Sequence, residues 1–302
     1  MKKIIIFLLS LIMCLSLCAC ADSETDDEGG ATRATGSAGL EYSRNSDGTY
    51  TVTGVGSCTD EEVVIPKYYK GGLVTYIAAD AFREYAIMKS VTVPESVAKI
   101  GDDAFWGCRK LEAVYITDLE AWCRIYFENY DSNPLHRGAA LYLKGELLTD
   151  LMIPAGIASI GNGAFAGCTS LTSVTIPDGV TSIGFAAFQD CTSLTSVTIP
   201  DSVTEICDYA FAGCTSLTSV TIPDSVTEID MYVFNGCTSL TSVTIPNSVT
   251  KIKGYAFYNC DSLTSIYFEG TMEQCEDMLS KSSDWLGEID GTLTIYCTDG
   301  EI

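Results

Sequence analysis

Apolar and polar positions along the middle of this chain follow one pattern that repeats every 23 residues. In residues 171–176 of one copy, the apolar Val174 and Ile176 alternate with serine and threonine, which predicts a short β-strand with one buried face. Pro177 ends that strand because a proline cannot donate a hydrogen bond to a neighbouring strand. Each copy of the pattern therefore predicts one strand.

The second half of each copy predicts a return arm. Val180 and Ile183 are three positions apart and the apolar pair 187–188 follows, which is the spacing of a helical or 3₁₀-like segment. A glycine such as Gly167 then permits the tight turn toward the next strand. Phenylalanines and cysteines mark the period at Phe165, Phe188, Phe211, Phe234, Phe257, Cys168, Cys191, Cys214, Cys237 and Cys260.

A fixed period of about 20 to 29 residues with one short strand per repeat is typical of a solenoid of the leucine-rich type. One repeat cannot bury its apolar face alone, but stacked neighbours can. We therefore predict an α/β-type leucine-rich repeat solenoid over residues 40–302. It has a parallel β-sheet on one face, short helical or 3₁₀ return arms on the other face, and capped ends.

The N-terminal part of the solenoid is predicted from weaker copies of the pattern. Residues 63–82 and 91–108 repeat the strand, the return arm and the phenylalanine. Ahead of them, residues 40–57 form a cap hairpin that turns at Asn-Ser-Asp-Gly, residues 45–48. Such a hairpin covers the open edge of the sheet, as the terminal units of a solenoid must.

Two further segments break the period. Residues 118–153 form an insertion, because the phenylalanines on either side of it are not separated by a multiple of 23 residues. Residues 267–302 form a C-terminal cap in which the repeat motif is lost. The elements predicted within these segments are helices at 118–130 and 272–279, and strands at 140–143, 147–153 and 292–297.

The repeats share the motif C-x-S-L-x-S-V-x-I-P-x-S-V-x-x-I-x-x-x-A-F, which resembles the BspA-type leucine-rich repeat of bacterial and protist surface proteins. The hairpin, the insertion and the C-terminal cap are also similar to segments of that family, so the resemblance covers residues 40–302. It implies a right-handed leucine-rich solenoid and a surface role, in some members adhesion to host proteins or to other cells. It implies no single ligand.

The N-terminal residues carry the features of an export signal. Lysines at positions 2 and 3 precede an apolar stretch at 4–17 that is short for a membrane-spanning helix. The stretch leads into Leu-Cys-Ala-Cys, which resembles a bacterial lipoprotein signal. The resemblance implies a signal peptide at 1–19, lipidation of Cys20 and a lipid anchor at the bacterial cell surface as the only membrane contact. Residues 20–39 are small, polar and acidic, which predicts a flexible tether.

Net charge and cysteine content limit the possible partners and the possible disulfide bonds. The net charge of −23 argues against nucleic acid and anionic lipid as partners and favours basic ones. Of the 14 cysteines, three lie in the signal or at the lipidation site, and the 11 that remain cannot all pair internally. Equivalent cysteines of stacked repeats lie about 4.8 Å apart with parallel side chains, whereas a disulfide needs converging ones. We predict a column of buried thiols.

Signals for catalysis, cofactors and metals are weak. His136 is the only histidine, and no recognisable nucleophile motif accompanies it. The 40 acidic residues form no motif for carboxylate-pair catalysis. Aspartates that follow the repeat prolines are explained as caps of the return arm, with a calcium-binding column as the alternative. We therefore predict a protein that is not an enzyme and that uses no cofactor and no metal.

Three surfaces are candidates for binding a partner. Serine and threonine columns on the strand face either grip a repetitive polymer such as a glycan or are ordinary exposed strand residues. The return arms vary between copies and gain tyrosines, and the aromatic side chains of the insertion either bind a partner or seal the core. The candidate binding residues are Trp122, Tyr126, Phe127, Tyr130, Tyr209, Tyr232 and Tyr255.

These features together predict a non-catalytic adhesion lipoprotein at the cell surface. Its solenoid would recognise macromolecules of a host or of a neighbouring cell, and the partner is an extracellular protein or glycan. The alternative is a structural spacer or surface-layer protein without a specific ligand. The repeat motif is specific for the fold and does not distinguish these two functions.

Overall fold

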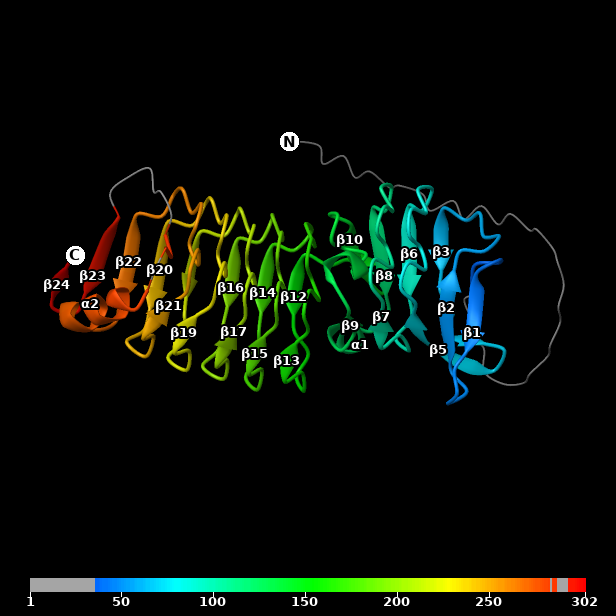
Figure 1. Ribbon diagram of the computed structural model, residues 1–302, viewed down its shortest axis with the longest axis horizontal. Coiled ribbons are helices and arrows are strands. Elements are labelled where there is room, and N and C mark those ends of the chain that lie inside the picture. The colour runs from blue at the N-terminus through cyan, green and yellow to red at the C-terminus, as the bar shows by residue number, and fades with distance from the viewer. Residues whose placement is uncertain (1–35, 283, 287–292) are drawn as a thin grey trace, which may run out of the picture. The chain divides into compact units, whose positions relative to one another are not determined.

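The computed structural model describes residues 36–282, 284–286 and 293–302 (Figure 1). The predicted signal peptide, Cys20 and the tether as far as residue 35 lie outside the described residues. The described part belongs to one compact unit, in which short strands stack side by side as successive coils of a solenoid. The predicted repeat solenoid with parallel strands is confirmed.

One line of strands forms the face that the alternating pattern predicted. Neighbouring copies pair in parallel and in register, so that Val174 lies beside Val197, and Val243 beside Ile266. Val174 and Val243 are buried, whereas Thr198 on the opposite side of its strand is exposed. These strands are β3 (Glu62–Val64), β6 (Ser90–Val93), β8 (Ala113–Ile116) and β10 (Ala140–Leu143) in one sheet, β12 (Asp150–Met152), β14 (Ser173–Thr175) and β16 (Ser196–Thr198) in the next, and β18 (Ser219–Thr221), β20 (Ser242–Ile245), β22 (Ser265–Phe268) and β23 (Thr294–Cys297) in a third.

A second line of strands, most of them two residues long, runs along the return arms. For example, β15 (Ser182–Ile183) pairs in parallel with β13 (Ser159–Ile160) on one side and with β17 (Glu205–Ile206) on the other. The isoleucine of each of these strands is buried in the core. The other strands of this line are β2 (Tyr50–Gly54), β5 (Gly72–Ile77), β7 (Lys99–Ile100), β9 (Tyr126–Phe127), β19 (Glu228–Ile229) and β21 (Lys251–Ile252).

The return arms therefore differ from the short helical arms that the three-residue spacing predicted. The N–H groups of Ala164 and Ala166 donate to carbonyls three residues earlier, as in a 3₁₀ turn, but Phe165 between them donates to Ala187 of the next coil. Successive N–H groups thus donate alternately to a carbonyl of their own coil and to a carbonyl of the next coil. A helix needs each successive N–H for its own carbonyls, so the arms form single turns and short strands.

The core is built from columns of equivalent side chains. The five repeat phenylalanines are fully buried and stack nearly parallel, with neighbouring ring centroids 5.3 to 5.7 Å apart. The predicted column of buried thiols is present beside them. Its sulfurs also make hydrogen bonds, since Cys237 Sγ donates to Phe211 O at 3.3 Å and Cys214 Sγ donates to Phe188 O at 3.2 Å. The thiols therefore link each coil to the one before it.

The predicted N-terminal hairpin is confirmed, because β1 (Glu41–Arg44) pairs antiparallel with β2. The solenoid begins earlier than the predicted boundary at residue 40. Ser37 N donates to Val64 O at 2.8 Å, and Val64 N donates to Ser37 Oγ at 3.0 Å. These bonds satisfy groups that the edge strand β3 would otherwise leave open. Residues 36–39 thus belong to the solenoid, not to a flexible tether.

The insertion differs from its prediction in two places. The helix predicted over 118–130 ends early, because α1 covers Leu119–Cys123 and Tyr126 N then donates to Ala98 O as part of β9. Pairing with the preceding coil thus replaces further helical turns. The strand predicted over 147–153 is two strands, β11 (Glu146–Leu147) in a hairpin with β10, and β12 in the next sheet. A 3₁₀ turn, η1 (Tyr130–Ser132), lies between β9 and β10.

The C-terminal cap contains the predicted helix and strand. Helix α2 (Met272–Ser280) begins with a capping box, in which the Thr271 hydroxyl accepts from Gln274 N and the Gln274 side chain accepts from Thr271 N. β23 pairs in parallel with β22 and antiparallel with β24 (Gly300–Glu301). Over the residues that the structure describes, no helix is both long and apolar enough to span a bilayer.

Candidate binding surface

One backbone position in each of seven coils has a left-handed conformation. It lies two residues before the core phenylalanine, and its φ angle is between 53° and 63°. This conformation turns the chain from the second line of strands toward the core. The residues at this position are Asp80, Asp103, Gly163, Ala186, Tyr209, Tyr232 and Tyr255.

Tyrosine is an unfavourable residue for this position. Glycine adopts a positive φ without steric cost and aspartate does so at low cost, whereas other side chains lose about 1 to 2 kcal/mol. Asp80, Asp103 and Gly163 demonstrate that the same turn forms in this chain with the favourable residues. The backbone therefore does not require the three tyrosines. Strained residues of this kind persist where the surrounding structure holds them, and they cluster at functional sites.

The three tyrosines stack on one another along the outside of the return arms. The ring centroids of Tyr209 and Tyr232 are 4.7 Å apart at an interplanar angle of 11°, and those of Tyr232 and Tyr255 are 5.1 Å apart at 12°. Phe185 lies at one end, tilted by 60° against Tyr209, and Tyr258 meets Tyr255 edge-on at 88°. We call these five residues, Phe185, Tyr209, Tyr232, Tyr255 and Tyr258, the aromatic ladder.

The aromatic ladder is exposed at its two ends, and Tyr209 and Tyr232 between them are half-buried. Phe185, Tyr255 and Tyr258 expose 46%, 36% and 37% of their surface, and Met231 beside them exposes 39%. Large apolar side chains gathered at one place on a surface are typical of an interaction site. Because the stacked rings cover one another's faces, the surface that remains consists of ring edges and hydroxyl groups.

The sequence identified the three stacked tyrosines but missed the other members of this surface. Phe185 and Met231 occupy one equivalent position, where the remaining regular copies carry Asn162, Asp208 and Gly254. Tyr258 directly follows a core phenylalanine. A signal was available, since an aromatic residue at a position that is polar or glycine in sister copies is not explained by the repeat itself.

Carboxylates border the aromatic ladder. Burial raises the pKa of Tyr209, and the neighbouring Tyr232 and Asp208 add to this shift. Lys253 Nζ lies 2.5 Å from an Asp230 carboxylate oxygen and 3.1 Å from one of Glu228, and hydrogen bonds to these two groups raise the pKa of the lysine. Two carboxylates thus surround the single charge of Lys253, and this cluster carries a net negative charge.

The aromatic side chains of the insertion are mostly buried. Trp122 is 1% exposed and donates from Nε1 to Ala164 O at 2.9 Å. Phe127 is 4% exposed and packs edge-on against the ring of Trp122 at 5.6 Å. Trp122 thus fastens the insertion to the next coil, and Phe127 supports it. Of the two roles that the sequence allowed for these side chains, binding a partner or sealing the core, their burial fits the second. Tyr126 differs, since 58% of it is exposed.

Tyr126 lines a cleft at the break in the second line of strands. β9 is the last strand of one sheet and β13 is the first of the next. Between them lies a cleft of about 420 Å³, whose lining includes Tyr126, Ile157, Ser159 and Asn162. The cleft adds a recess to the return-arm face. Two of the aromatic residues that the sequence proposed for binding line it, the exposed Tyr126 and the buried Phe127.

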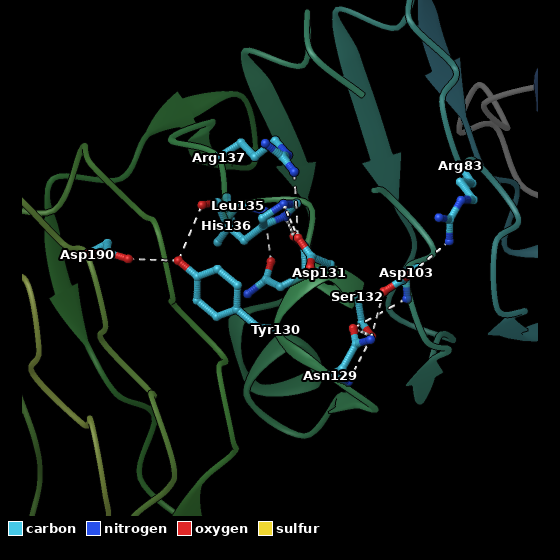
Figure 2. A network of polar contacts seen from close by, with 11 residues as sticks. Arg83, Asp103, Asn129, Tyr130, Asp131, Ser132, Leu135, His136, Arg137 and Asp190 are labelled. Atoms are coloured by element: carbon cyan, nitrogen blue, oxygen red, sulfur yellow. Dashed lines mark hydrogen bonds and ion pairs between the residues drawn. The ribbon is translucent and has the colours of Figure 1, made fainter. Parts of the chain in front are cut away.

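Tyr130 and the single histidine belong to a polar network (Figure 2). Tyr130 Oη donates to Asp190 Oδ2 at 2.8 Å, which ties the insertion to a coil 60 residues later, and burial raises the pKa of Tyr130. His136 Nδ1 lies 2.6 Å from Asn133 O, and Nε2 lies 2.8 Å from Asp131 Oδ1. Burial lowers the pKa of His136, although these two acceptors act in the opposite direction.

This network stabilises the insertion. Asn129 extends it by donating from Nδ2 to Asp103 Oδ1 at 2.9 Å, and Asp103 in turn lies 2.8 Å from Arg83 Nη1 (Figure 2). Nδ1 of His136 contacts Asn133 O, and the buried Nε2 lies closest to Asp131 Oδ1 without a hydrogen bond, so both contacts of the ring are made within the insertion. Among the described residues, no group of three histidine, cysteine or acidic side chains is placed to hold a metal ion.

The strand face carries exposed hydroxyl columns as the alternation predicted. Thr175, Thr198 and Thr221 are exposed. Pairs of tyrosines also lie on this face. In one pair the ring centroids of Tyr267 and Tyr296 are 5.3 Å apart, and the two residues are 47% and 40% exposed. None of these residues has a strained backbone, and tyrosine and threonine are favoured on strands. The strand face is therefore explained by strand preference alone.

Comparison with known proteins identifies the repeats. A family model of the BspA type leucine rich repeat region matches residues 57–132 and 158–286, in six copies. The chain belongs to the BspA-type leucine-rich repeat family. A search of curated proteins found no match.

Several solved structures are similar to this BspA-type chain. A leucine-rich repeat protein from Bacteroides ovatus is 26% identical, with a TM-score of 0.42 over 76% of this chain and 69% of that one. A leucine rich cell surface protein from Faecalibacterium prausnitzii is 23% identical, with a TM-score of 0.34 over 85% of this chain and 98% of that one. The pneumococcal vaccine antigen PcpA is 18% identical, with a TM-score of 0.44 over 83% of each chain.

The aromatic ladder lies within the BspA-type repeats. Residues 185–258 fall inside the second matched stretch, whereas residues 133–157 of the insertion fall between the two stretches. The ladder is thus formed by aromatic residues at positions that other coils of this chain fill with other residue types. The tyrosines lie on the regular repeats of the solenoid and not on the insertion.

Proposed function

We propose that this BspA-type repeat protein is an exported, lipid-anchored bacterial surface protein that binds a protein partner through its aromatic ladder, without catalysis. The observation that carries the proposal is the presence of Tyr209, Tyr232 and Tyr255 at left-handed backbone positions. The fold would be more stable there with the aspartate or glycine found in sister coils. A row of side chains kept against backbone preference is best explained by a contact that they make.

The geometry of the ladder favours a protein over a glycan. Aromatic residues hold sugars mainly by offering an open ring face, but the faces of Tyr209 and Tyr232 cover each other at 4.7 Å. What remains is a strip of ring edges and hydroxyl groups with Met231 beside it. Tyrosine and methionine are enriched in protein interfaces, and tyrosine gives a large contact area with little loss of side-chain entropy.

Charge favours a basic partner. The chain carries a net charge of −23, and Asp208 lies beside Tyr209 of the ladder, while Asp230 and Glu228 share the single charge of Lys253. A negative surface attracts a positively charged protein and accelerates its association. The interaction should therefore weaken as salt is added, because screening shortens the reach of these charges.

Export and anchoring are supported by the sequence of residues 1–20, which resembles a lipoprotein signal ending in Cys20. A lipid at Cys20 followed by an acidic segment would hold the solenoid away from a negatively charged membrane. The solenoid would then be accessible from the medium or from a neighbouring cell, which is where a partner for an adhesion protein is found.

Arrays of purified extracellular proteins and of glycans, probed with the purified protein, test the proposal. The informative variant replaces Tyr209, Tyr232 and Tyr255 together by asparagine, which tolerates the left-handed conformation and adds no charge. The matched control makes the same change at three strand-face positions, Thr198, Thr221 and Thr244.

We expect the unaltered protein and the control to bind the same protein spots, and the ladder variant to lose at least about tenfold in affinity. Its midpoint of urea unfolding should be unchanged or higher, because strain is removed. Full binding by the ladder variant would contradict the role of the ladder. Binding confined to glycan spots would contradict a protein partner, and binding to neither array would favour a structural spacer.

A further inference from the structure

Two cysteines of the C-terminal cap come from different elements and face the same space. Cys275 lies in the second turn of α2 and is fully buried. Cys297 is the last residue of β23 and is partly exposed, and its side chain packs against the core. Burial raises the pKa of both thiols, and the neighbouring Cys297 raises that of Cys275 further.

The surrounding contacts bring the helix and the strand together. Met272 lies one helical turn before Cys275 and on the same side of α2. Its side chain packs on Gly300, where an added Cβ would lie only 2.8 Å from Met272 Sδ. Gly300 is the residue that pairs with Cys297 in the hairpin of β23 and β24. The face of the helix that carries Cys275 therefore rests on the hairpin that carries Cys297.

Two hydrogen bonds donated by main-chain N–H groups hold this arrangement, one to a side chain and one to a main-chain carbonyl. Met272 N donates to Asp299 Oδ1 at 2.7 Å. Thr298 N donates to Gly270 O at 2.9 Å, directly before the helix. The start of α2 and the hairpin that carries Cys297 are thus held together by contacts other than those of the two cysteines.

The repeat cysteines provide a contrast within the same chain. Cys214 and Cys237 occupy equivalent sites of successive coils, so their side chains run parallel, and Cys237 Sγ donates to Phe211 O at 3.3 Å. A disulfide requires Cβ atoms about 3.8 Å apart with converging directions. Cys275 projects from a helix and Cys297 from a strand, which allows that convergence.

We propose that Cys275 and Cys297 form a disulfide bond that locks α2 onto the last strands of the C-terminal cap in an oxidising environment. The repeat cysteines remain thiols. The odd number of cysteines predicted for the mature chain excludes complete pairing but is compatible with this one bridge. The proposal concerns the stability of the cap and does not rest on the binding function of the aromatic ladder.

The bond forms by thiol–disulfide exchange with a low-molecular-weight disulfide such as glutathione disulfide. Cys297, the more exposed residue, reacts first, because its thiolate attacks one sulfur of the oxidant, whose S–S bond breaks to release one glutathione thiolate. Cys275 then loses its proton and attacks the sulfur of Cys297 in the mixed disulfide, which releases the second glutathione. Two protein thiols are oxidised, one glutathione disulfide is reduced, and the two protons end on the two glutathione thiols.

The test uses the full-length protein, incubated with glutathione disulfide, denatured, alkylated with N-ethylmaleimide, digested and examined by mass spectrometry. We expect one peptide pair linked through Cys275 and Cys297, with the repeat cysteines alkylated. In the native protein, oxidation should lower the labelling of Cys297 by a maleimide at least tenfold. In the matched variant Cys275→Ser, Cys297 should end as a stable mixed disulfide with glutathione, because the second thiol is missing.

Recovery of both cysteines as alkylated thiols after exhaustive oxidation would overturn the proposal. A bridge from Cys297 to Cys207, or to a second copy of the chain, would overturn it as well. Mass spectrometry of the unaltered protein decides the question, so the outcome does not depend on how well a variant folds. Array binding is measured separately, and its failure would leave this result unaffected.

Discussion

Replacing Phe211 by alanine removes one ring from the middle of the phenylalanine column. The ring is fully buried, with centroids 5.4 Å from Phe188 and 5.7 Å from Phe234. The main chain of Phe211 bonds independently of the ring, since its N–H donates to Val233 O at 2.9 Å and its carbonyl accepts from Cys237 Sγ. Alanine keeps both bonds, so the substitution measures the packing of the ring.

The expected loss of stability is about 4 kcal/mol. Truncating a buried phenylalanine removes its transfer free energy and leaves a cavity, which together amount to about 3 to 5 kcal/mol. The main chains of Phe188 and Phe234 are held by hydrogen bonds to Ala210 and Ala256 of the next coils, so their rings cannot close the gap. The loss should therefore lie above the low end of that range. In a solenoid the loss falls on one coil and its two interfaces, so the central coils should unfold first.

Urea unfolding followed by two signals checks this expectation. Trp122 in the insertion and Trp285 beside Phe257 report from either flank by fluorescence, while circular dichroism reports from all coils. For Phe211→Ala, the circular dichroism signal should begin to change at a lower urea concentration than the fluorescence. In the unaltered protein the two signals should change together.

The control for this experiment is Ser219→Ala, on the exposed strand face. Surface substitutions away from special features usually change stability by less than about 0.5 kcal/mol. Equal losses from the two variants, or a larger loss from Ser219→Ala, would mean that the inside and the outside of the solenoid had been assigned the wrong way round. A loss below about 1 kcal/mol for Phe211→Ala would mean that the ring column contributes little.

Two further predictions concern the cysteines. Burial raises the pKa of the Cys191, Cys214 and Cys237 thiols well above the ordinary value of 9.0, so the stability that their neutral forms contribute is complete below pH 9 and is lost as pH rises beyond it. The midpoint of urea unfolding should therefore stay level from about pH 6 to 8 and fall above about pH 9. In Cys214→Ala, which lacks one of these thiols, the fall should be less steep. A rise of the midpoint above pH 9 would refute the buried column. Cys20→Ala should abolish labelling by fatty acid and release the protein from membranes, and a labelled, membrane-bound variant would show that Cys20 is not the lipidation site.

The sequence predicted the inside of the solenoid because each inward residue is constrained by its neighbours in two coils. A smaller side chain at Phe211 leaves a cavity between Phe188 and Phe234, and a larger one has no room between rings 5.4 and 5.7 Å away. The same column therefore keeps the same residue type, and its period can be read directly. The strand face could be predicted for the same reason, because its inward valines are constrained by neighbouring coils and alternate with threonines on the outer side.

The return arms and the insertion were harder to predict because their hydrogen-bond partners lie in other coils. Phe165 donates to Ala187, and Tyr126 donates to Ala98. Local spacing suggested helix in both segments, since apolar residues three or four positions apart look the same whether the backbone bonds within the segment or across to a neighbour. Only the three-dimensional stack decides between these two arrangements.

The candidate site was predictable in part for a different reason. Variation between copies drew attention to Tyr209, Tyr232 and Tyr255, but variation alone does not separate a selected position from a free one. The φ angle of about 60° makes that separation, since a position without constraint would drift toward the residues that its backbone favours, as at Asp80 and Gly163. Four successive coils depart from that preference, one with Ala186 and the next three with tyrosines whose rings stack. Function is therefore best sought in this protein where the side chains oppose the backbone.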